Sequence, residues 1–248
     1  MSFADYSSLD RPELLRILFY PRKDFTPPPP NSTDYLIRVE GNISIACRFY
    51  IHNQESPSIL YFHGNGEVVS DHDCLAPLYN RLGINLFVAD YRGYGSSGGT
   101  PNFTNLFADA HSIFKGFGKI LREGHYSNET FVMGRSLGSI LAVELAFHYE
   151  RQIKGLIVES GFGSMGRMMT RLGFSMESLG INAAEFPNLA KIRGITLPTL
   201  IIHAEFDTIA PLAGAKELFE HAAAERKRMV IIPGADHNKG LVAIVTFS

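Results

Sequence analysis

Apolar runs and helical stretches alternate along most of this chain of 248 residues. From Ile59 onward, short runs rich in β-branched residues recur, and longer stretches with apolar residues at helical spacing separate them. This alternation predicts a parallel sheet with helices on both faces. The near-continuous apolar character of the runs is typical of strands that are buried on both sides. The predicted strands are Ile59–Phe62, Asn85–Ala89, Thr130–Met133, Gly155–Glu159, Thr199–His203 and Met229–Ile232.

Two parts of the chain depart from this alternation. Ahead of it, Leu9–Phe19 predicts a short helix, for which packing against the domain is favoured over contact with a membrane or a partner. Tyr35–Val39 and Ile43–Ile51 then predict an antiparallel hairpin. Further on, residues 161–195 interrupt the pattern and hold four of the seven methionines. Their helical spacing fits two uses equally well, either lining a pocket for apolar groups or packing on the sheet.

A Gly-x-Ser-x-Gly motif, Gly134–Gly138, lies between a predicted strand and a predicted helix. A serine on such a tight turn has an exposed hydroxyl, and the glycines allow close backbone approach. The helix start supplies free backbone N–H groups to a developing negative charge. Ser136 is therefore the candidate nucleophile.

A serine nucleophile needs a base, and the base needs an acid that fixes its tautomer. In a doubly wound sheet, these groups follow later strands in the order serine, acid, histidine. Asp207 follows the strand at 199–203, and His237 follows the strand at 229–232. They are the candidate acid and base. Glu159, at the end of another strand, is the main rival for the acid, and Glu205 and Asp236 are weaker ones.

An oxyanion hole needs two donors. The backbone N–H of Leu137, directly after the serine, is the first candidate. The second candidate is Asn65, in the loop after the strand at 59–62, with Gly66 as the alternative. His63 stands before a glycine at the same strand end, and we expect it to brace this loop rather than take part in chemistry.

These motifs together resemble the α/β-hydrolase superfamily over almost the whole chain. The Asp-Tyr-Arg-Gly-Tyr-Gly-x-Ser block is similar to a subgroup of single-domain hydrolases with small lids, which includes esterases and depalmitoylating thioesterases. The arginine before the serine also resembles that subgroup. The matching segments are His63–Gly66, Asp90–Gly98, Gly134–Gly138, His203–Pro211 and Asp236–Asn238.

The resemblance implies an α/β-hydrolase fold, which is a mostly parallel sheet of about eight strands flanked by helices, here with the N-terminal antiparallel hairpin. It implies one domain over residues 1–248 with a small lid at 161–195, in which Met165, Met168 and Met169 are candidate substrate contacts. Members of this superfamily usually continue after the catalytic histidine into a full helix. Here, eleven residues follow His237, so the chain departs from that pattern.

Composition narrows the class of partner. A formal net charge of −2 and the absence of a basic cluster argue against nucleic acid. Cys47 and Cys74 give neither a disulfide framework nor metal spacing, and we expect both thiols to be buried. No signal segment and no apolar run approaching 18 residues is present. We therefore expect a cytoplasmic protein without stable membrane insertion. The oligomeric state is left open.

The leading hypothesis is a serine hydrolase of carboxylic esters or thioesters that uses Ser136, His237 and Asp207 and needs no metal or organic cofactor. Its substrate would be a small acyl compound. Small amides or peptides share the same chemistry and remain an alternative. A binding module on the same fold, with catalysis lost or incidental, is the other alternative, because a fold alone does not assign a function.

Overall fold

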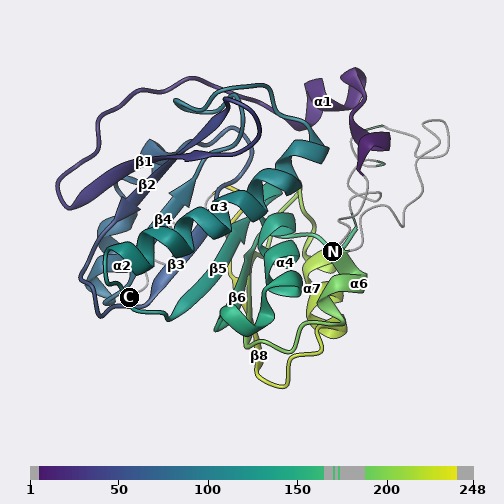
Figure 1. Cartoon of the computed structure of the whole chain (residues 1–248). Helices are drawn as coiled ribbons and strands as arrows, with labels where there is room; N and C mark the ends of the chain where they lie inside the picture. The colour runs from purple at the N-terminus through teal and green to yellow at the C-terminus, as the bar shows by residue number, and fades with distance from the viewer. Residues whose placement is uncertain (1–5, 165–169, 171–172, 174–187, 239–248) are drawn as a thin grey trace. The chain divides into compact units, whose positions relative to one another are not determined.

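A computed structural model describes residues 6–164, 170, 173 and 188–238 (Figure 1). Contacts between residues divide the chain into two compact units, Met1–Val132 and Met133–Ser248. Eight strands form a sheet in the order β1-β2-β4-β3-β5-β6-β7-β8. This is the expected mostly parallel, helix-flanked α/β-hydrolase fold with an N-terminal hairpin. The single domain with a lid at 161–195 stays a prediction.

The first unit contains the hairpin and the first parallel pair. Strand β1 pairs antiparallel with β2, β2 pairs antiparallel with β4, and β4 pairs parallel with β3. The expected hairpin is therefore confirmed. The elements are η1 (Ser7–Leu9), α1 (Pro12–Leu18), β1 (Ser32–Arg38), β2 (Ser44–Tyr50), β3 (Ser58–Phe62), η2 (Val69–His72), α2 (Ala76–Arg81), β4 (Asn85–Ala89) and α3 (Phe103–Glu123).

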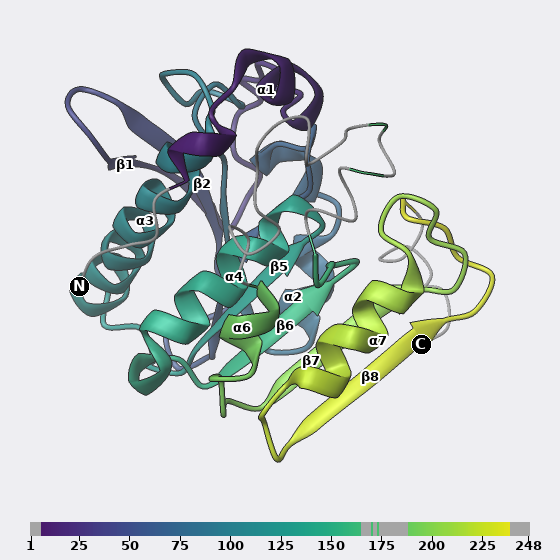
Figure 2. The same ribbon diagram turned by 90° about the vertical axis from the view of Figure 1, so that its right-hand side faces the viewer.

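The second unit continues the parallel pattern, with β6 beside β7 and β7 beside β8. Helix α4 packs on β6, α6 lies between α4 and α7, and α7 packs on β7 (Figure 2). Helix α4 is apolar nearly all round and buried along most of its length, as a central helix must be. The elements are β5 (Thr130–Arg135), which spans the boundary between the units, α4 (Leu137–His148), η3 (Glu150–Gln152), β6 (Gly155–Glu159), α6 (Asn188–Ile192), β7 (Thr199–Ala204), α7 (Leu212–His221) and β8 (Lys227–Ile232).

The residues on either side of the N-terminal helix contact α3 of the same unit: Asp10 binds Phe103, and the Phe19 ring lies 5.2 Å from the Phe103 ring. Leu14 and Leu18 of α1 are buried. Just before α1, the Asp10 carboxylate accepts a hydrogen bond of 2.7 Å from the backbone N–H of Phe103, the first residue of α3. The first N–H groups of a helix have no acceptor inside it, so Asp10 stabilises the start of α3.

The Asp90–Gly98 block holds the first unit together. The Asp90 carboxylate lies 3.1 Å from Nε2 of the fully buried His63, whose Nδ1 lies 2.8 Å from the carbonyl oxygen of Gly64. Gly95 has φ +50°, and a Cβ there would lie 2.0 Å from an Asp90 carboxylate oxygen, so only glycine fits. Arg92 binds Asp109 of α3 through two hydrogen bonds of 2.7 and 2.8 Å. His63 thus braces its loop, as the sequence predicted.

Two expectations about burial need correction. Cys47 is buried, but Cys74 is exposed, because it lies in the loop between η2 and α2 rather than in an apolar element. Strand β8 is the last strand in the sheet order and is only partly buried, with Ile231 39% exposed. Among the described strands it has a neighbour on one side only, so its apolar run does not signify burial on both faces. Among the described residues, no helix has the length and apolar character needed to cross a bilayer.

Candidate active site

Ser136 sits on a strained turn between β5 and α4. Its backbone has φ 49° and ψ −114°, a region that non-glycine residues rarely occupy. Its N–H donates a hydrogen bond of 2.9 Å to the carbonyl oxygen of Glu159 on β6, which fixes the turn. A Cβ on Gly134 would lie 2.2 Å from the carbonyl oxygen of Gly138, so the turn can close only with glycine at 134. This is the sharp elbow that the motif predicted.

His237 lies within hydrogen-bond distance of both Ser136 and Asp207. His237 Nε2 is 3.1 Å from the Ser136 hydroxyl, and His237 Nδ1 is 2.7 Å from Asp207 Oδ2. A carboxylate can only accept, so Nδ1 carries the proton and Nε2 is left as an acceptor for the serine hydroxyl. The second oxygen, Asp207 Oδ1, accepts from the backbone N–H groups of Ile209 at 3.0 Å and Ala210 at 2.7 Å. The carboxylate is thereby fixed in orientation.

The loops that carry the acid and the histidine are joined to each other. The backbone N–H of Phe206 donates to the carbonyl oxygen of Ala235 at 2.9 Å. The Glu205 carboxylate accepts a hydrogen bond of 2.9 Å from the N–H of Gly234. Glu205, one of the weaker rivals for the acid, therefore ties the two loops together, while Asp207 contacts the His237 ring. Asp236 accepts from the N–H of Asn238 in its own loop.

Glu159, the main rival for the acid, is directed to a different partner. Its carboxylate lies 3.6 Å from Nε of Arg135, and both side chains are almost completely buried. Arg135 in turn donates a hydrogen bond of 2.7 Å from Nη2 to the backbone carbonyl oxygen of His237. The residue before the serine thus holds the histidine loop in place. The sequence motif contains this arginine but does not indicate its contact with the histidine loop.

A second histidine lies beside the acid. His203 is fully buried, with Nε2 2.6 Å from the carbonyl oxygen of Ala210 and 3.5 Å from Asp207 Oδ2. A carbonyl oxygen can only accept, so Nε2 carries a proton. Burial lowers the pKa of His203, which favours its neutral form. A neutral His203 supports the loop around Asp207 and leaves the carboxylate charge to His237.

The two candidate oxyanion donors lie in different units. Leu137 is the first residue of α4, where the backbone N–H has no acceptor within the helix. Asn65 lies in the loop after β3, and its side-chain oxygen accepts from the Tyr94 hydroxyl at 2.6 Å and the Tyr20 N–H at 3.0 Å. These contacts occupy the side chain of Asn65 and fix the loop. Met165, Met168 and Met169 lie outside the described residues.

The chain matches known hydrolases in sequence and in fold. A family model described as "Serine aminopeptidase, S33" matches residues 53–187 and 183–239. The α/β hydrolase domain-containing protein 17B of Xenopus tropicalis is 30% identical over 212 residues, which cover 82% of this chain and 68% of that protein. An esterase of Pyrococcus furiosus superposes with a TM-score of 0.72 at 18% identity, covering 92% of this chain and 94% of the other. Est1E of Butyrivibrio proteoclasticus, with ferulic acid bound, superposes with a TM-score of 0.70 at 17% identity and covers 86% of this chain and 95% of its own. The two superpositions concern the fold alone.

Proposed function

Because the chain belongs to the α/β-hydrolase family described as serine aminopeptidase S33, we propose that it cleaves carboxylic esters or thioesters through an acyl-enzyme on Ser136. The observation that carries the proposal is the hydrogen-bonded series Asp207–His237–Ser136. This series supports Ser136 as the nucleophile, His237 as the base and Asp207 as the acid, the three roles that acyl transfer requires. No metal or organic cofactor takes part in the proposed reaction.

The first half of the reaction forms the acyl-enzyme. His237 Nε2 takes the proton of the Ser136 hydroxyl as its oxygen attacks the acyl carbon. Asp207 stabilises the imidazolium that forms and keeps Nδ1 protonated. The imidazolium then gives its proton to the leaving alcohol or thiol, and the bond between the acyl carbon and that group breaks.

The second half releases the acid. His237 takes a proton from water, the resulting hydroxyl attacks the acyl carbon, and Ser136 leaves with the proton that His237 returns. In both halves the carbonyl oxygen becomes negative, and the backbone N–H groups of Leu137 and Asn65 are the proposed donors to it. Removing one donor from an oxyanion hole lowers turnover by about 10²–10³ in a serine protease.

A small-amide or peptide hydrolase is the second candidate, because the matching family model carries the name of an aminopeptidase. Esters and thioesters are favoured by the methionines at 161–195, which suit an acyl chain or an aromatic acid better than a charged peptide. We propose that this segment is the lid and that the substrate is a small acyl compound in the cytoplasm.

The experiment that tests the proposal is labelling with a fluorophosphonate, a reagent that traps activated serine hydroxyls. We expect one adduct, at Ser136, on the folded protein and none on the Ser136→Ala variant. An adduct on another residue, or no adduct on folded protein, would contradict the assignment. Parallel assays of an acyl ester, the matching thioester and an aminoacyl amide then rank the three leaving groups.

The proposed lid makes a separate prediction about chain length. Replacing Met168 and Met169 by Ala is expected to slow hydrolysis of long acyl esters and leave the shortest ester nearly unaffected. The reason is that apolar burial contributes roughly 0.8 kcal/mol per buried CH₂, and a short acyl group does not reach the lid. The measurement is kcat/KM across a chain-length series. An equal decrease for all chain lengths would favour the packing role of this segment.

A further inference from the structure

The outer edge of β1 has open backbone groups. In the β1–β2 pair, Val39 N–H donates to Ile43 and Ile51 N–H donates to Asn31, so the odd-numbered residues of β1 form the hydrogen-bonded pairs with β2. The N–H and C=O groups of Asp34, Leu36 and Arg38 consequently point away from β2. Strand β1 is the first in the sheet order, and no other described strand pairs with that edge. Such an edge is a template for a further strand.

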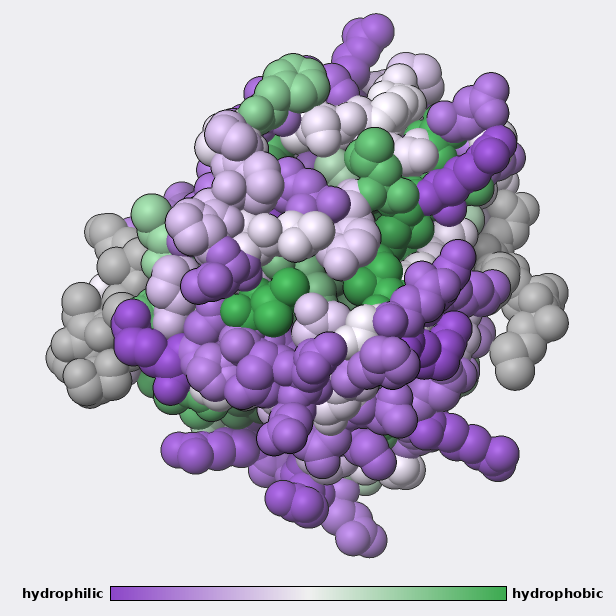
Figure 3. Space-filling view, turned by 60° about the vertical axis from the view of Figure 1, so that its left-hand side comes forward, coloured by the Kyte–Doolittle hydropathy of each residue, from purple (hydrophilic) through white to green (hydrophobic). Residues whose placement is uncertain are grey.

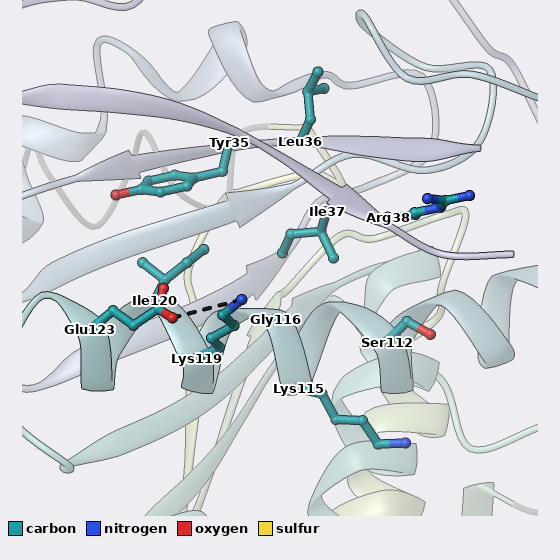
Figure 4. Close-up of a pocket in the computed structure, with 10 residues that line it drawn as sticks. All are labelled: Tyr35, Leu36, Ile37, Arg38, Ser112, Lys115, Gly116, Lys119, Ile120 and Glu123. Carbon is teal, nitrogen blue, oxygen red and sulfur yellow. Dashed lines mark ion pairs between the residues drawn. The ribbon is translucent and has the colours of Figure 1, made fainter. Parts of the chain in front are cut away.

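The side chains along this edge are exposed and partly apolar. Leu36 is 69% exposed. On the opposite face of β1, Ile37 is buried and directed toward α3, while Leu36 points away from it (Figure 4). Between β1 and α3 runs a groove of about 580 Å³, lined by residues 35–38 of the strand and by Ser112, Lys115, Gly116, Lys119, Ile120 and Glu123 of the helix. Figure 3 shows one face of the molecule, where hydrophobic side chains gather in small patches among hydrophilic ones.

The charges along the edge are opposite in sign and placed symmetrically about Leu36. Asp34 lies two residues before it and Arg38 two residues after it, and all three side chains share one face of the strand. If two β1 strands pair antiparallel about Leu36, Asp34 of each copy lies directly opposite Arg38 of the other. On the groove side, Tyr35 of each copy then lies opposite Ile37 of the other. The strand is thus complementary to itself.

The surroundings of Asp34 favour a second cation. Arg48 is buried between Asp34 and Asp73, with hydrogen bonds of 2.7 Å to Asp34 and 2.9 Å to Asp73. Two carboxylates around one guanidinium leave one negative charge, and the Asp34 side chain is 45% exposed. Arg38 is bound through Nε and Nη2 to Gly41 and Asn42. Its Nη1 has no hydrogen-bond partner among the described residues.

We propose that this edge joins two copies of the chain into a symmetric dimer through β1–β1 pairing, with Leu36 on the two-fold axis. Roughly six backbone hydrogen bonds would form, two for each of the pairs 34–38, 36–36 and 38–34. Leu36 would pack on its own symmetry mate between two Asp34–Arg38 ion pairs. A closed two-fold contact of this kind satisfies both open edges at once. The proposal is independent of the reaction at Ser136.

The test is the molar mass of the full chain by sedimentation or light scattering, from about 1 to 100 μM. We expect a dimer that dissociates on dilution. Leu36→Lys puts two like charges on the two-fold axis and is expected to raise the dissociation constant at least about a hundredfold. Leu82→Lys is the matched control, because Leu82 is also an exposed leucine of the same unit, 76% exposed, and lies after α2. It is expected to leave the dimer intact.

A second measurement reports the register. In a Cys74→Ser background, Leu36→Cys is expected to cross-link to itself with a short bis-maleimide, since opposite Cα atoms in a hydrogen-bonded pair lie about 5.5 Å apart. Leu82→Cys is expected not to cross-link. A wild-type chain that stays monomeric at every concentration would overturn the proposal. The outer edge of β1 would then face solvent or bind another protein. A dimer that Leu36→Lys does not weaken would overturn the proposal too, and melting curves of the variants verify that they are folded.

Discussion

Replacing Asp207 by Asn is expected to lower turnover far more than the small change in shape suggests. Asp207 Oδ1 accepts from the N–H groups of Ile209 and Ala210. In the variant only the amide oxygen can accept there, so the NH₂ group must take the place of Oδ2, which lies 2.7 Å from His237 Nδ1. That NH₂ donates to Nδ1, and the ring proton moves to Nε2. A protonated Nε2 cannot take the proton of Ser136.

The size of the expected decrease in kcat follows from the loss of the His237 tautomer that can accept the serine proton. The same substitution in the triad of a serine protease lowers kcat about 10⁴-fold, which corresponds to about 5.5 kcal/mol in the activation free energy. We expect a similar loss here, because Asp207 is held by two backbone donors and cannot turn to present its oxygen to His237. Labelling by the fluorophosphonate should slow in parallel, since it depends on the same activated hydroxyl.

Glu159→Gln is the matched control, because Glu159 is the other buried carboxylate beside the elbow. Its carboxylate lies 3.6 Å from Arg135 Nε, so its loss disturbs the ion pair and leaves the proton on His237 Nδ1 unaffected. We expect kcat to fall by no more than about tenfold. The assay is kcat on a short-chain activated ester, with melting temperatures measured alongside. If Glu159→Gln lowers kcat more than Asp207→Asn does, the acid is Glu159 and the tautomer argument is refuted.

Two further predictions concern packing. Gly134→Ala places a Cβ 2.2 Å from the backbone oxygen of Gly138 and is expected to destabilise the protein by about 1–3 kcal/mol, a decrease in Tm of about 2–12 °C. Gly41→Ala, where φ is +58° and no atom lies within 4 Å of the new Cβ, carries only the cost of a left-handed backbone and should lower Tm by about 2–8 °C. A decrease for Gly41→Ala that equals or exceeds the one for Gly134→Ala would contradict the elbow argument. Alkylation of the folded protein near pH 8 should modify Cys74 and spare Cys47, because burial raises the pKa of the Cys47 thiol well above its ordinary value. Mass spectrometry that finds both thiols modified at similar rates would refute it.

Hydrophobic periodicity located the elements well, because it reports which segments need to be buried. The predicted strands at 85–89 and 155–159 have the observed bounds, and the others differ by at most two residues at either end, except that β1 begins three residues before the predicted start at Tyr35. The hydrophobic periodicity of a segment does not indicate which strands lie next to it in the sheet. The antiparallel pairing of β2 with β4, and the position of β4 between β2 and β3, depend on contacts between segments that carry no mark of one another in the sequence. The partial exposure of β8 could not be predicted for the same reason, because it depends on the position of β8 at the end of the strand order.

The candidate site could be predicted as far as its residues follow strand ends. Ser136 comes directly after β5, and Asp207 and His237 lie in the loops that follow β7 and β8. Parallel strands bring their carboxyl ends to one edge of the sheet. The bond from Arg135 to His237 could not be found this way. It joins a side chain to a backbone carbonyl 102 residues away, and every residue has such a carbonyl. The sequence indicates only that an arginine precedes the serine, and this does not identify the carbonyl group that the arginine binds.

The two buried carboxylates beside Ser136 have different partners, and this difference explains why both are present. The Glu159 carboxylate lies 3.6 Å from Nε of Arg135, whereas the Asp207 carboxylate accepts a hydrogen bond from His237. A carboxylate beside a buried guanidinium lowers the cost of burying its charge, and Glu159 supplies one for Arg135. Arg135 then fixes the main chain of His237, while Asp207 fixes its ring. The histidine is therefore held at two points, and its Nε2 has little freedom to leave the serine hydroxyl. A site held within about 0.5 Å of its working geometry is what acyl transfer requires.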